Sequence, residues 1–270
     1  MTALYLDCSM GAAGDMLCAA LIDLLLDPEH FVRRFNALGI PQLEMKLSQK
    51  EKCGIVGRHV HMIIRGIEEG ASYRVVPKKV IEHAHKHSCD NHAHQSPFDH
   101  EHRGKTDVAA IICALPIEES IMLKALSVYD AIAEAEGKVH GKPVTEIHFH
   151  EVGSLDAIAD IVAFSMLIDE LSPDYIFASP VHVGSGTVRC AHGILPVPAP
   201  ATAELLQGIP SYSSEIRGEL CTPTGAALLK SFVDKFQMQP QMIVERVGYG
   251  MGNKDFPIAN CIRAIYGELS

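Results

Sequence analysis

Residues 3–26 read ALYLDCSMGAAGDMLCAALIDLLL. The apolar run from Ala3 to Asp7 predicts a short strand, and the almost wholly apolar run from Met16 to Leu26 predicts a buried helix that Asp27-Pro28 ends. Small residues join the two, from Ser9 to Asp15. In such a turn backbone N–H groups can approach an anion, and the helix dipole assists them. The turn matches neither GxxxxGK[ST] nor GxGxxG, so it predicts neither a P-loop nor a Rossmann site.

Beyond this stretch the chain alternates predicted strands with predicted helices. An alternating apolar and polar pattern indicates an antiparallel strand pair over 43–65. Helices are expected over 29–38, 77–84, 106–114, 118–138, 154–171, 201–206 and from Gly225 to Phe236, and further strands over 144–152, 175–183, 242–250 and 260–267. Because these elements interleave without a regular βαβ period, the expected fold class is α+β, a mixed α/β globular core.

The polar composition of residues 83–105 cannot bury a core, so we predict a disordered His-rich loop there. This loop separates an N-terminal α/β segment, 1–82, from the main α/β segment, 106–270. The two segments are expected to form one compact domain, which a chain of 270 residues allows.

Composition argues against several classes of protein. The formal charge of −10 disfavours non-specific nucleic-acid binding, which depends on basic surface. The chain has no apolar run of the ~18 residues that span a bilayer, and its first residues, MTALYLDCSMG, carry no secretion signal. Its eight cysteines are scattered without a CxxC motif, which indicates reduced thiols. We therefore expect a cytoplasmic protein with no nucleic-acid or membrane partner.

Seven of the twenty residues from 83 to 102 are histidines. Imidazole is a poor core filler, but neutral imidazole is a common ligand of borderline ions such as Ni²⁺, Cu²⁺ and Zn²⁺. The tract therefore predicts metal acquisition or storage, without distinguishing nickel from zinc or copper. The alternative is a polar loop whose histidines are incidental. The predicted metal ligands in the tract are His83, His85, His87, His92, His94, His100 and His102.

The sharpest group of candidates outside the tract lies in the segment EIHFHEVGSLD. On a strand, His148 and His150 point to the same face, about 6.6 Å apart along the chain, so both can reach one ion. Glu151 follows directly, and Asp156 shares a helix face with Asp160. We predict His148, His150 and Glu151 as catalytic residues, and His148, His150 and Asp156 as metal ligands. The alternative is a half-buried strand whose histidines bond locally, followed by a solvated acidic helix face.

Two strand-to-helix turns are candidates for binding an anionic cofactor. The first is the glycine-containing turn near the N-terminus, and the second is the segment TPTG, where hydroxyls stand at the mouth of a helix. A side-chain cap of that helix would explain the hydroxyls equally well. The glycine-rich segments GSG, HG and GYGMG are weaker signals, typical of turns. The predicted cofactor-binding residues are Gly11, Gly14, Asp15, Thr222, Thr224, Gly225 and His192.

In their order and spacing these segments resemble the LarC family, the nickel-insertion proteins that complete the nickel-pincer nucleotide cofactor of lactate racemase. The matching segments are YLDCSMGAAGDM, the His tract, VTEIHFHEVGSLDAIADIV, SPVHVGSGTVRCAHGILPVPAPAT, ELCTPTGAALL and VGYGMGNKDF. They cover almost the whole chain, so the resemblance is specific.

The resemblance implies a nickel insertase or chelatase of the lyase class, which places Ni²⁺ in pyridinium-3,5-bisthiocarboxylic acid mononucleotide. The family reaction is linked to CTP and a divalent cation, Mg²⁺ or Mn²⁺. Formation of the carbon–nickel bond expels a ring proton, so the reaction needs a general base, for which His148, His150 and Glu151 are candidates. Full-length members carry a C-terminal region with the CTP site, which some members have as a separate polypeptide. The present chain resembles the N-terminal part.

Two other functions remain open at this point. One is a non-enzymatic nickel chaperone or storage protein that uses the tract alone. The other is a divalent-metal-dependent hydrolase built on His148, His150, Glu151 and Asp156. We also expect a homo-oligomer.

Overall fold

The computed structural model describes residues 1–68, 103–149, 152–190 and 192–270. Several predictions fall outside these described residues. They are the helix over 77–84, residues 83–102 of the loop predicted over 83–105 with its seven histidine ligands, and two of the predicted catalytic residues, His150 and Glu151.

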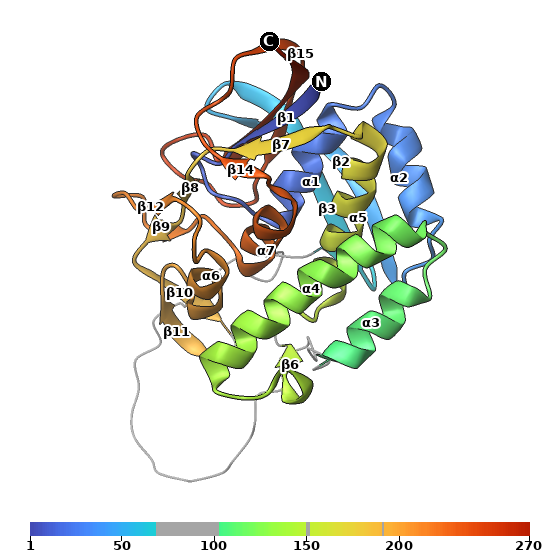
Figure 1. Ribbon diagram of the computed structural model, residues 1–270, viewed down its shortest axis with the longest axis vertical. Helices are drawn as coiled ribbons and strands as arrows, with labels where there is room; N and C mark the ends of the chain where they lie inside the picture. The colour runs from blue at the N-terminus through green and yellow to red at the C-terminus, as the bar shows by residue number, and fades with distance from the viewer. Residues whose placement is uncertain (69–102, 150–151, 191) are drawn as a thin grey trace, which may run out of the picture.

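A mixed sheet of eight strands is the largest sheet among the described residues (Figure 1). Seven strands follow one another in the order β14-β7-β1-β16-β15-β3-β2, and β4 pairs with β3. Their bounds are β1 Thr2–Asp7, β2 Leu43–Lys52, β3 Ile55–Ile64, β4 Ile67–Glu68, β7 Tyr175–Ala178, β14 Lys235–Phe236, β15 Met242–Met251 and β16 Cys261–Leu269. The β1–β7, β7–β14 and β15–β3 pairs are parallel, and the others are antiparallel. The predicted antiparallel pair over 43–65 is confirmed as β2 and β3.

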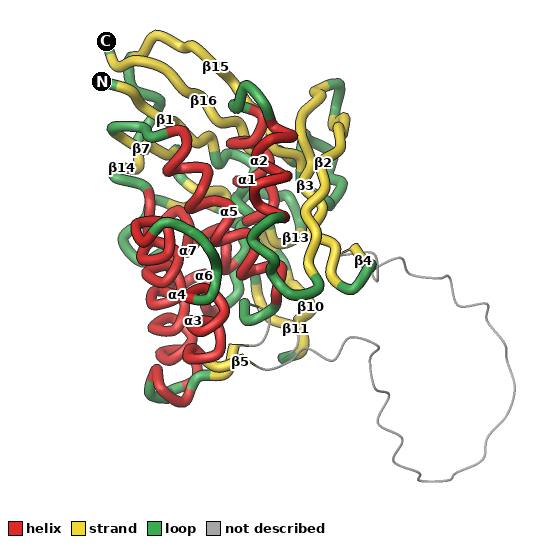
Figure 2. Tube along the Cα trace, turned by 90° about the vertical axis from the view of Figure 1, so that its right-hand side faces the viewer, coloured by secondary structure: helices red, strands yellow, loops and turns green. Residues whose placement is uncertain are grey.

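The helices gather on one face of this sheet (Figure 2). They are α1 Gly14–Asp23, α2 Pro28–Asn36, α3 Lys105–Cys113, α4 Glu119–His140, α5 Leu155–Leu171, α6 Pro200–Leu205 and α7 Pro223–Phe232. Short strand pairs complete the fold: β5 Arg103–Gly104 with β6 His148–Phe149, β8 Val181–His182 with β12 Ser211–Tyr212, β9 Gly184–Ser185 with β13 Gly218–Glu219, and β10 Thr187–Cys190 with β11 Gly193–Pro196. The predicted α+β fold class is confirmed.

Four predicted elements differ from the structure. The loop predicted over 83–105 ends earlier, because Arg103 and Gly104 pair with β6 and α3 begins at Lys105. The strand expected over 175–183 is divided between β7 in the main sheet and β8, which pairs with β12. The strand expected over 144–152 is instead a 3₁₀ turn, Val144–Glu146, followed by the two-residue β6, because the Glu146 N–H donates to the Pro143 carbonyl at 2.9 Å. The helix expected to reach Phe236 ends at Phe232. There the Asp234 carboxylate accepts the Ile176 N–H at 2.8 Å, which draws the following residues into the sheet as β14.

The core lies between the sheet and the helices. Helix α1 packs on β15, β3 and β16 on one side and on α5 on the other, and α4 covers α5 from outside. Being enclosed on both sides explains why α1 is apolar throughout from Met16 to Ile22. Strand β1 alternates, with Leu4 and Leu6 in this core and Tyr5 on the opposite face beside Phe177 and Ile265.

The glycines of GYGMG, interpreted above as a turn, lie in and just after β15, where they let α1 approach the sheet. A Cβ atom on Gly250 would stand 1.9 Å from the Met16 carbonyl oxygen, and one on Gly248 would stand 2.2 Å from the Ala20 carbonyl oxygen. Only glycine permits such contact between a strand backbone and a helix backbone. No helix in the described part of the chain has the length and apolar character needed to cross a membrane.

Candidate functional site

The two strand-to-helix turns chosen from the sequence lie against each other. The Ala12 N–H donates to the Leu220 carbonyl at 3.0 Å, and the Thr222 N–H donates to the Ala12 carbonyl at 2.9 Å. Gly11 has a φ of +89°, and a Cβ there would stand 2.0 Å from the Leu220 oxygen. A Cβ on Gly225 would stand 2.2 Å from the Ala12 oxygen. The glycines are therefore needed for the close approach of the two turns.

The mouth of α7 is capped by its own side chain. The Thr222 hydroxyl accepts the Gly225 N–H at 3.1 Å, and Thr224 is partly buried in the first turn that follows. This is the side-chain cap that the sequence allowed as an alternative. The residues that cap α7 therefore have a structural role whether or not they also contact an anion.

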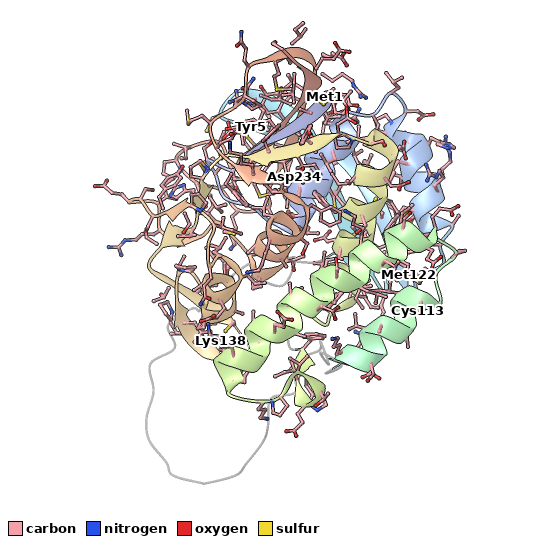
Figure 3. All side chains as sticks on the ribbon, viewed as in Figure 1. Met1, Tyr5, Cys113, Met122, Lys138 and Asp234 are labelled. Carbon is pink, nitrogen blue, oxygen red and sulfur yellow. The ribbon has the colours of Figure 1, made fainter. Side chains whose placement is uncertain are left out.

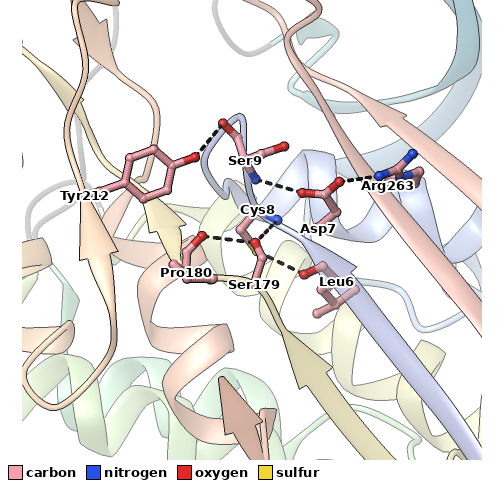
Figure 4. A network of polar contacts seen from close by, with 8 residues as sticks. All are labelled: Leu6, Asp7, Cys8, Ser9, Ser179, Pro180, Tyr212 and Arg263. Carbon is pink, nitrogen blue, oxygen red and sulfur yellow. Dashed lines mark hydrogen bonds and ion pairs between the residues drawn. The ribbon is translucent and has the colours of Figure 1, made fainter. Parts of the chain in front are cut away.

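A network of polar contacts orders the entry to α1 (Figure 4). The Ser9 N–H donates to Asp7 Oδ1 at 3.1 Å, and Arg263 pairs with Asp7 Oδ2 at 2.7 Å. From the other side the Tyr212 hydroxyl donates to the Ser9 carbonyl at 3.4 Å, and the ring of His182 stacks on the Tyr212 ring with centroids 4.7 Å apart. The turn is thus held by residues from β1, β16 and β12.

Two buried thiols lie beside the turns, at Cys8 and Cys221. Burial raises the pKa of the Cys8 thiol, and the neighbouring Cys221 and Asp7 raise it further. Burial and Glu219 likewise raise the pKa of Cys221. Burial thus favours the protonated thiol at both positions.

A buried carboxyl pair joins α1 to α5. Asp160 is 8% exposed, and its Oδ1 atom has no hydrogen-bond partner. Its Oδ2 atom lies so close to Gly14 that a Cβ there would stand 2.2 Å away. Burial raises the pKa of Asp160 well above its usual value, and the charges of Asp15 and Asp156 raise it further. The predicted residues Gly14, Asp15 and Asp156 therefore meet at one acidic cluster.

Asp15 opens the first turn of α1 and is the more accessible member of this pair. Burial raises its pKa to about 6. The rise is limited by the Met16 N–H, which donates to Asp15 Oδ1 at 2.8 Å, and by the positive charges of Lys50 and Lys254. Two carboxyl groups this close are not both ionised at mildly acidic pH.

A separate cavity of about 300 Å³ carries the imidazoles, and it is lined by His140, Lys142, Glu146, Ile147, His148 and His192. His140 is the last residue of α4, and His148 lies on β6 just beyond it. His192 stands in the hairpin turn between β10 and β11. Two residues predicted separately, one as catalytic and metal-binding and one as cofactor-binding, are thus brought together. Asp156 does not line this cavity.

His140 is a functional candidate that the sequence reasoning missed. It falls at the end of a helical pattern and has no second histidine nearby in the sequence, so its position looked like an ordinary helix terminus. A signal was present in the sequence, because Glu136 precedes His140 by one helical turn. In the structure the two side chains lie 3.2 Å apart. The Lys138 ammonium, labelled in Figure 3, pairs with Glu204 at 2.5 Å and ties this end of α4 to α6.

The cavity adjoins the point where the described chain resumes after the histidine tract. Arg103 follows the tract directly, and the β5–β6 pairing places Arg103 opposite Phe149 and Gly104 opposite His148. Within the described residues, no three His, Cys, Asp or Glu side chains converge closely enough to hold a metal ion by themselves. A metal ion in the cavity would therefore need further ligands from outside the described residues.

The chain matches known proteins over nearly its whole length. A family model described as nickel insertion protein matches residues 4–270. Three relatives are named pyridinium-3,5-bisthiocarboxylic acid mononucleotide nickel insertion protein. That of Desulfitobacterium hafniense is 39% identical over 270 residues, 100% of this chain and 59% of the relative. Those of Geobacillus kaustophilus and Clostridium kluyveri are 38% and 39% identical over 269 residues, 99% of this chain and 60% and 62% of the relatives.

The chain spans 59% to 62% of the length of these relatives. No solved structure matches it. The matched residues contain both turns, the carboxyl pair and the imidazole cavity. The resemblance drawn from the motifs is therefore confirmed, and the chain belongs to the nickel insertion protein family, LarC.

Proposed function

We propose that this chain acts as a nickel chelatase that inserts nickel into pyridinium-3,5-bisthiocarboxylic acid mononucleotide, alone or as one component. The names of the relatives support this reaction. The observation that carries it is the cavity in which His140, His148 and His192 meet from three separate segments of the chain. Its volume of about 300 Å³ is at the lower end of the range of small-molecule sites.

The chemistry suits this set of side chains. Nickel arrives as Ni²⁺ and is a substrate, and neutral imidazole is a ligand that holds this borderline ion and also releases it. Insertion replaces a ring C–H bond with a carbon–nickel bond, so one proton must leave and no electron is transferred. We propose His148, exposed on the cavity wall, as the acceptor of that proton. His150 and Glu151, which follow β6, stay predictions for the same task.

The phosphate group of the precursor has a cationic partner in the cavity. Lys142 lies on the same wall as the imidazoles, and its ammonium is a point charge suited to phosphate. At the two glycine turns, several backbone donors are already engaged by protein oxygens, among them those of Ala12, Met16 and Gly225. We therefore propose Lys142 for the phosphate, while the anion-binding role of the turns stays a prediction.

The remaining components of the reaction are proposals as well. We infer that CTP and Mg²⁺ or Mn²⁺ act through a C-terminal region like that of the family, present in the same or a separate polypeptide. The seven described cysteines are free thiols, which supports a cytoplasmic location. A homo-oligomeric state stays a prediction.

We expect His148→Ala to reduce formation of the nickel-containing nucleotide at least about ten-fold, because the ring proton loses its acceptor. The assay combines the protein with NiSO₄, the precursor, CTP, Mn²⁺ and the C-terminal region of a relative, and measures the product by mass spectrometry. His30→Ala, on the exposed face of α2, is the matched control and should stay within about two-fold of the unchanged protein. If the unchanged protein binds nickel but yields no product, the chain is a nickel chaperone or store instead.

A further inference from the structure

Two of the imidazoles that line the cavity lie close together. The ring centroids of His140 and His192 are 5.0 Å apart, with an angle of 32° between the ring planes. One ring comes from the last turn of α4 and the other from the β10–β11 hairpin. Rings at this separation can both direct a nitrogen at a single ion lying between them, since imidazole nitrogens bind metals at about 2.0–2.1 Å.

Glu136 supports one of these rings from behind. Its carboxylate lies 3.2 Å from His140 Nε2, and the two side chains are only 14% and 28% exposed. A metal-binding imidazole commonly donates its second ring N–H to a carboxylate, which fixes the ring and strengthens it as a ligand. In the neutral tautomer that donates Nε2–H to Glu136, Nδ1 is the nitrogen that can bind a metal ion.

The position at the end of α4 adds a further preference for a cation. Helix α4 runs from Glu119 to His140 and ends with Gly141 in the left-handed conformation. The carbonyl end of a helix carries a partial negative charge, which favours a positive ion or a cationic side chain near its last turn. The negative end of the α4 dipole, the Glu136 carboxylate and the two imidazoles thus lie at the same place.

We propose that His140 and His192 form a two-imidazole nickel site, with Glu136 as the positioning residue of His140. The open coordination positions are filled by water and, during the reaction, by the sulfur atoms of the thiocarboxylate precursor. This last step rests on the proposed function, whereas binding of nickel alone does not. The site agrees with the lack of any three-ligand cluster among the described residues, because the substrate completes the ligand set.

Such an incomplete site suits a metal that must be handed over. Sulfur ligands from the precursor displace water from the ion, and the imidazoles leave as the carbon–nickel bond forms and the ring proton passes to the base. Nickel stays in the +2 state throughout. A closed set of four protein ligands is typical of structural metal sites, which retain the ion.

The test measures binding of NiSO₄ alone by calorimetry, without precursor or CTP. The background is the full chain with the seven tract histidines changed to serine, so that nickel binding by the tract does not obscure nickel binding in the cavity. We expect this background to bind one nickel ion, and His140→Ala or His192→Ala to weaken binding at least about ten-fold. Glu136→Gln should weaken it roughly ten-fold, since loss of a supporting carboxylate typically costs 10–100-fold.

X-ray absorption spectroscopy supplies a readout that a merely structural role would not move. The bound nickel should show two imidazole ligands in the background and in Glu136→Gln, and one in His140→Ala or His192→Ala. The control His30→Ala, on the exposed face of α2, should retain both the affinity and the two-imidazole spectrum. No binding by the background, unchanged affinity in both single variants, or an equal loss in His30→Ala would overturn the proposal. Intact nickel binding without insertion activity would refute the proposed function and leave this site standing.

Discussion

Replacing Gly250 by alanine is expected to lower the free energy of unfolding by roughly 3 kcal/mol or more. The added Cβ would stand 1.9 Å from the Met16 carbonyl oxygen and 2.5 Å from the Ala20 nitrogen. Neither backbone can yield easily. Gly250 pairs with Ile262 on one side and Arg58 on the other, and α1 is enclosed between the sheet and α5. The helix must therefore move away from the sheet and lose buried contacts.

Denaturant unfolding followed by circular dichroism measures this effect, and a fall of about 6–12 °C in Tm should accompany it. Gly104→Ala is the matched control, because Gly104 has a φ of −78° and its added Cβ would find its nearest neighbour at 3.5 Å. The control should change stability by no more than about 1 kcal/mol. Equal unfolding midpoints for Gly250→Ala and the unchanged protein would show that α1 does not rest on β15 as described.

Replacing Asp160 by asparagine is expected to stabilise the protein at pH 8, on the order of 2 kcal/mol, and to have a smaller effect at pH 5. The pKa of Asp160 is raised well above 3.8 by burial, and by Asp15 and Asp156. An acid with a raised pKa in the folded state holds more protons folded than unfolded. Its favourable contribution is therefore present below about pH 4 and is lost as the pH rises through the folded pKa.

Asp15 also contributes to the loss of stability between pH 5 and pH 8. Its pKa is raised from 3.8 to about 6, and one pKa unit corresponds to about 1.4 kcal/mol, so its ionisation in the folded state costs about 3 kcal/mol by pH 8. A neutral amide at position 160 can donate to the Asp15 carboxylate, whose pKa is raised by burial. Part of that cost should then disappear, and the decline of stability between pH 5 and pH 8 should become shallower.

Urea unfolding at pH 5, 6, 7 and 8 tests this expectation. Asp169→Asn, on the exposed face of the same helix, is the control and should follow the unchanged protein at every pH. A stability gain that is the same at pH 5 and pH 8 would contradict the origin of the effect in ionisation. Destabilisation at pH 8 would show that the Asp160 carboxylate is stabilised by a partner in the folded state.

Most of the fold followed from local patterns. The apolar run of α1, the alternation in β2 and β3, and the long helices α4 and α5 can each be predicted because burial imposes a period on neighbouring residues. Prediction failed where pairing partners decide the structure. The chain after Phe232 extends because β7 offers a partner.

For the site, the sequence by itself determined which kinds of residue carry the chemistry. The sequence showed polar, titratable residues within segments predicted to be ordered, namely His148, His192 and the acidic residues of α1 and α5. The motifs that contain them led to the family. Only the tertiary structure decided their grouping. It separated Asp156 from His148, paired Asp15 with Asp160, and added His140 to the imidazole cavity.

The physical reason is the difference in range between the two kinds of interaction. A helix or strand is specified by neighbours a few residues away, and the periodicity records them in the sequence. The meeting of His140 with His192 depends on how the end of α4 packs near α6 and the β10–β11 hairpin. That packing arises from contacts between segments far apart in the chain, and no local pattern encodes it.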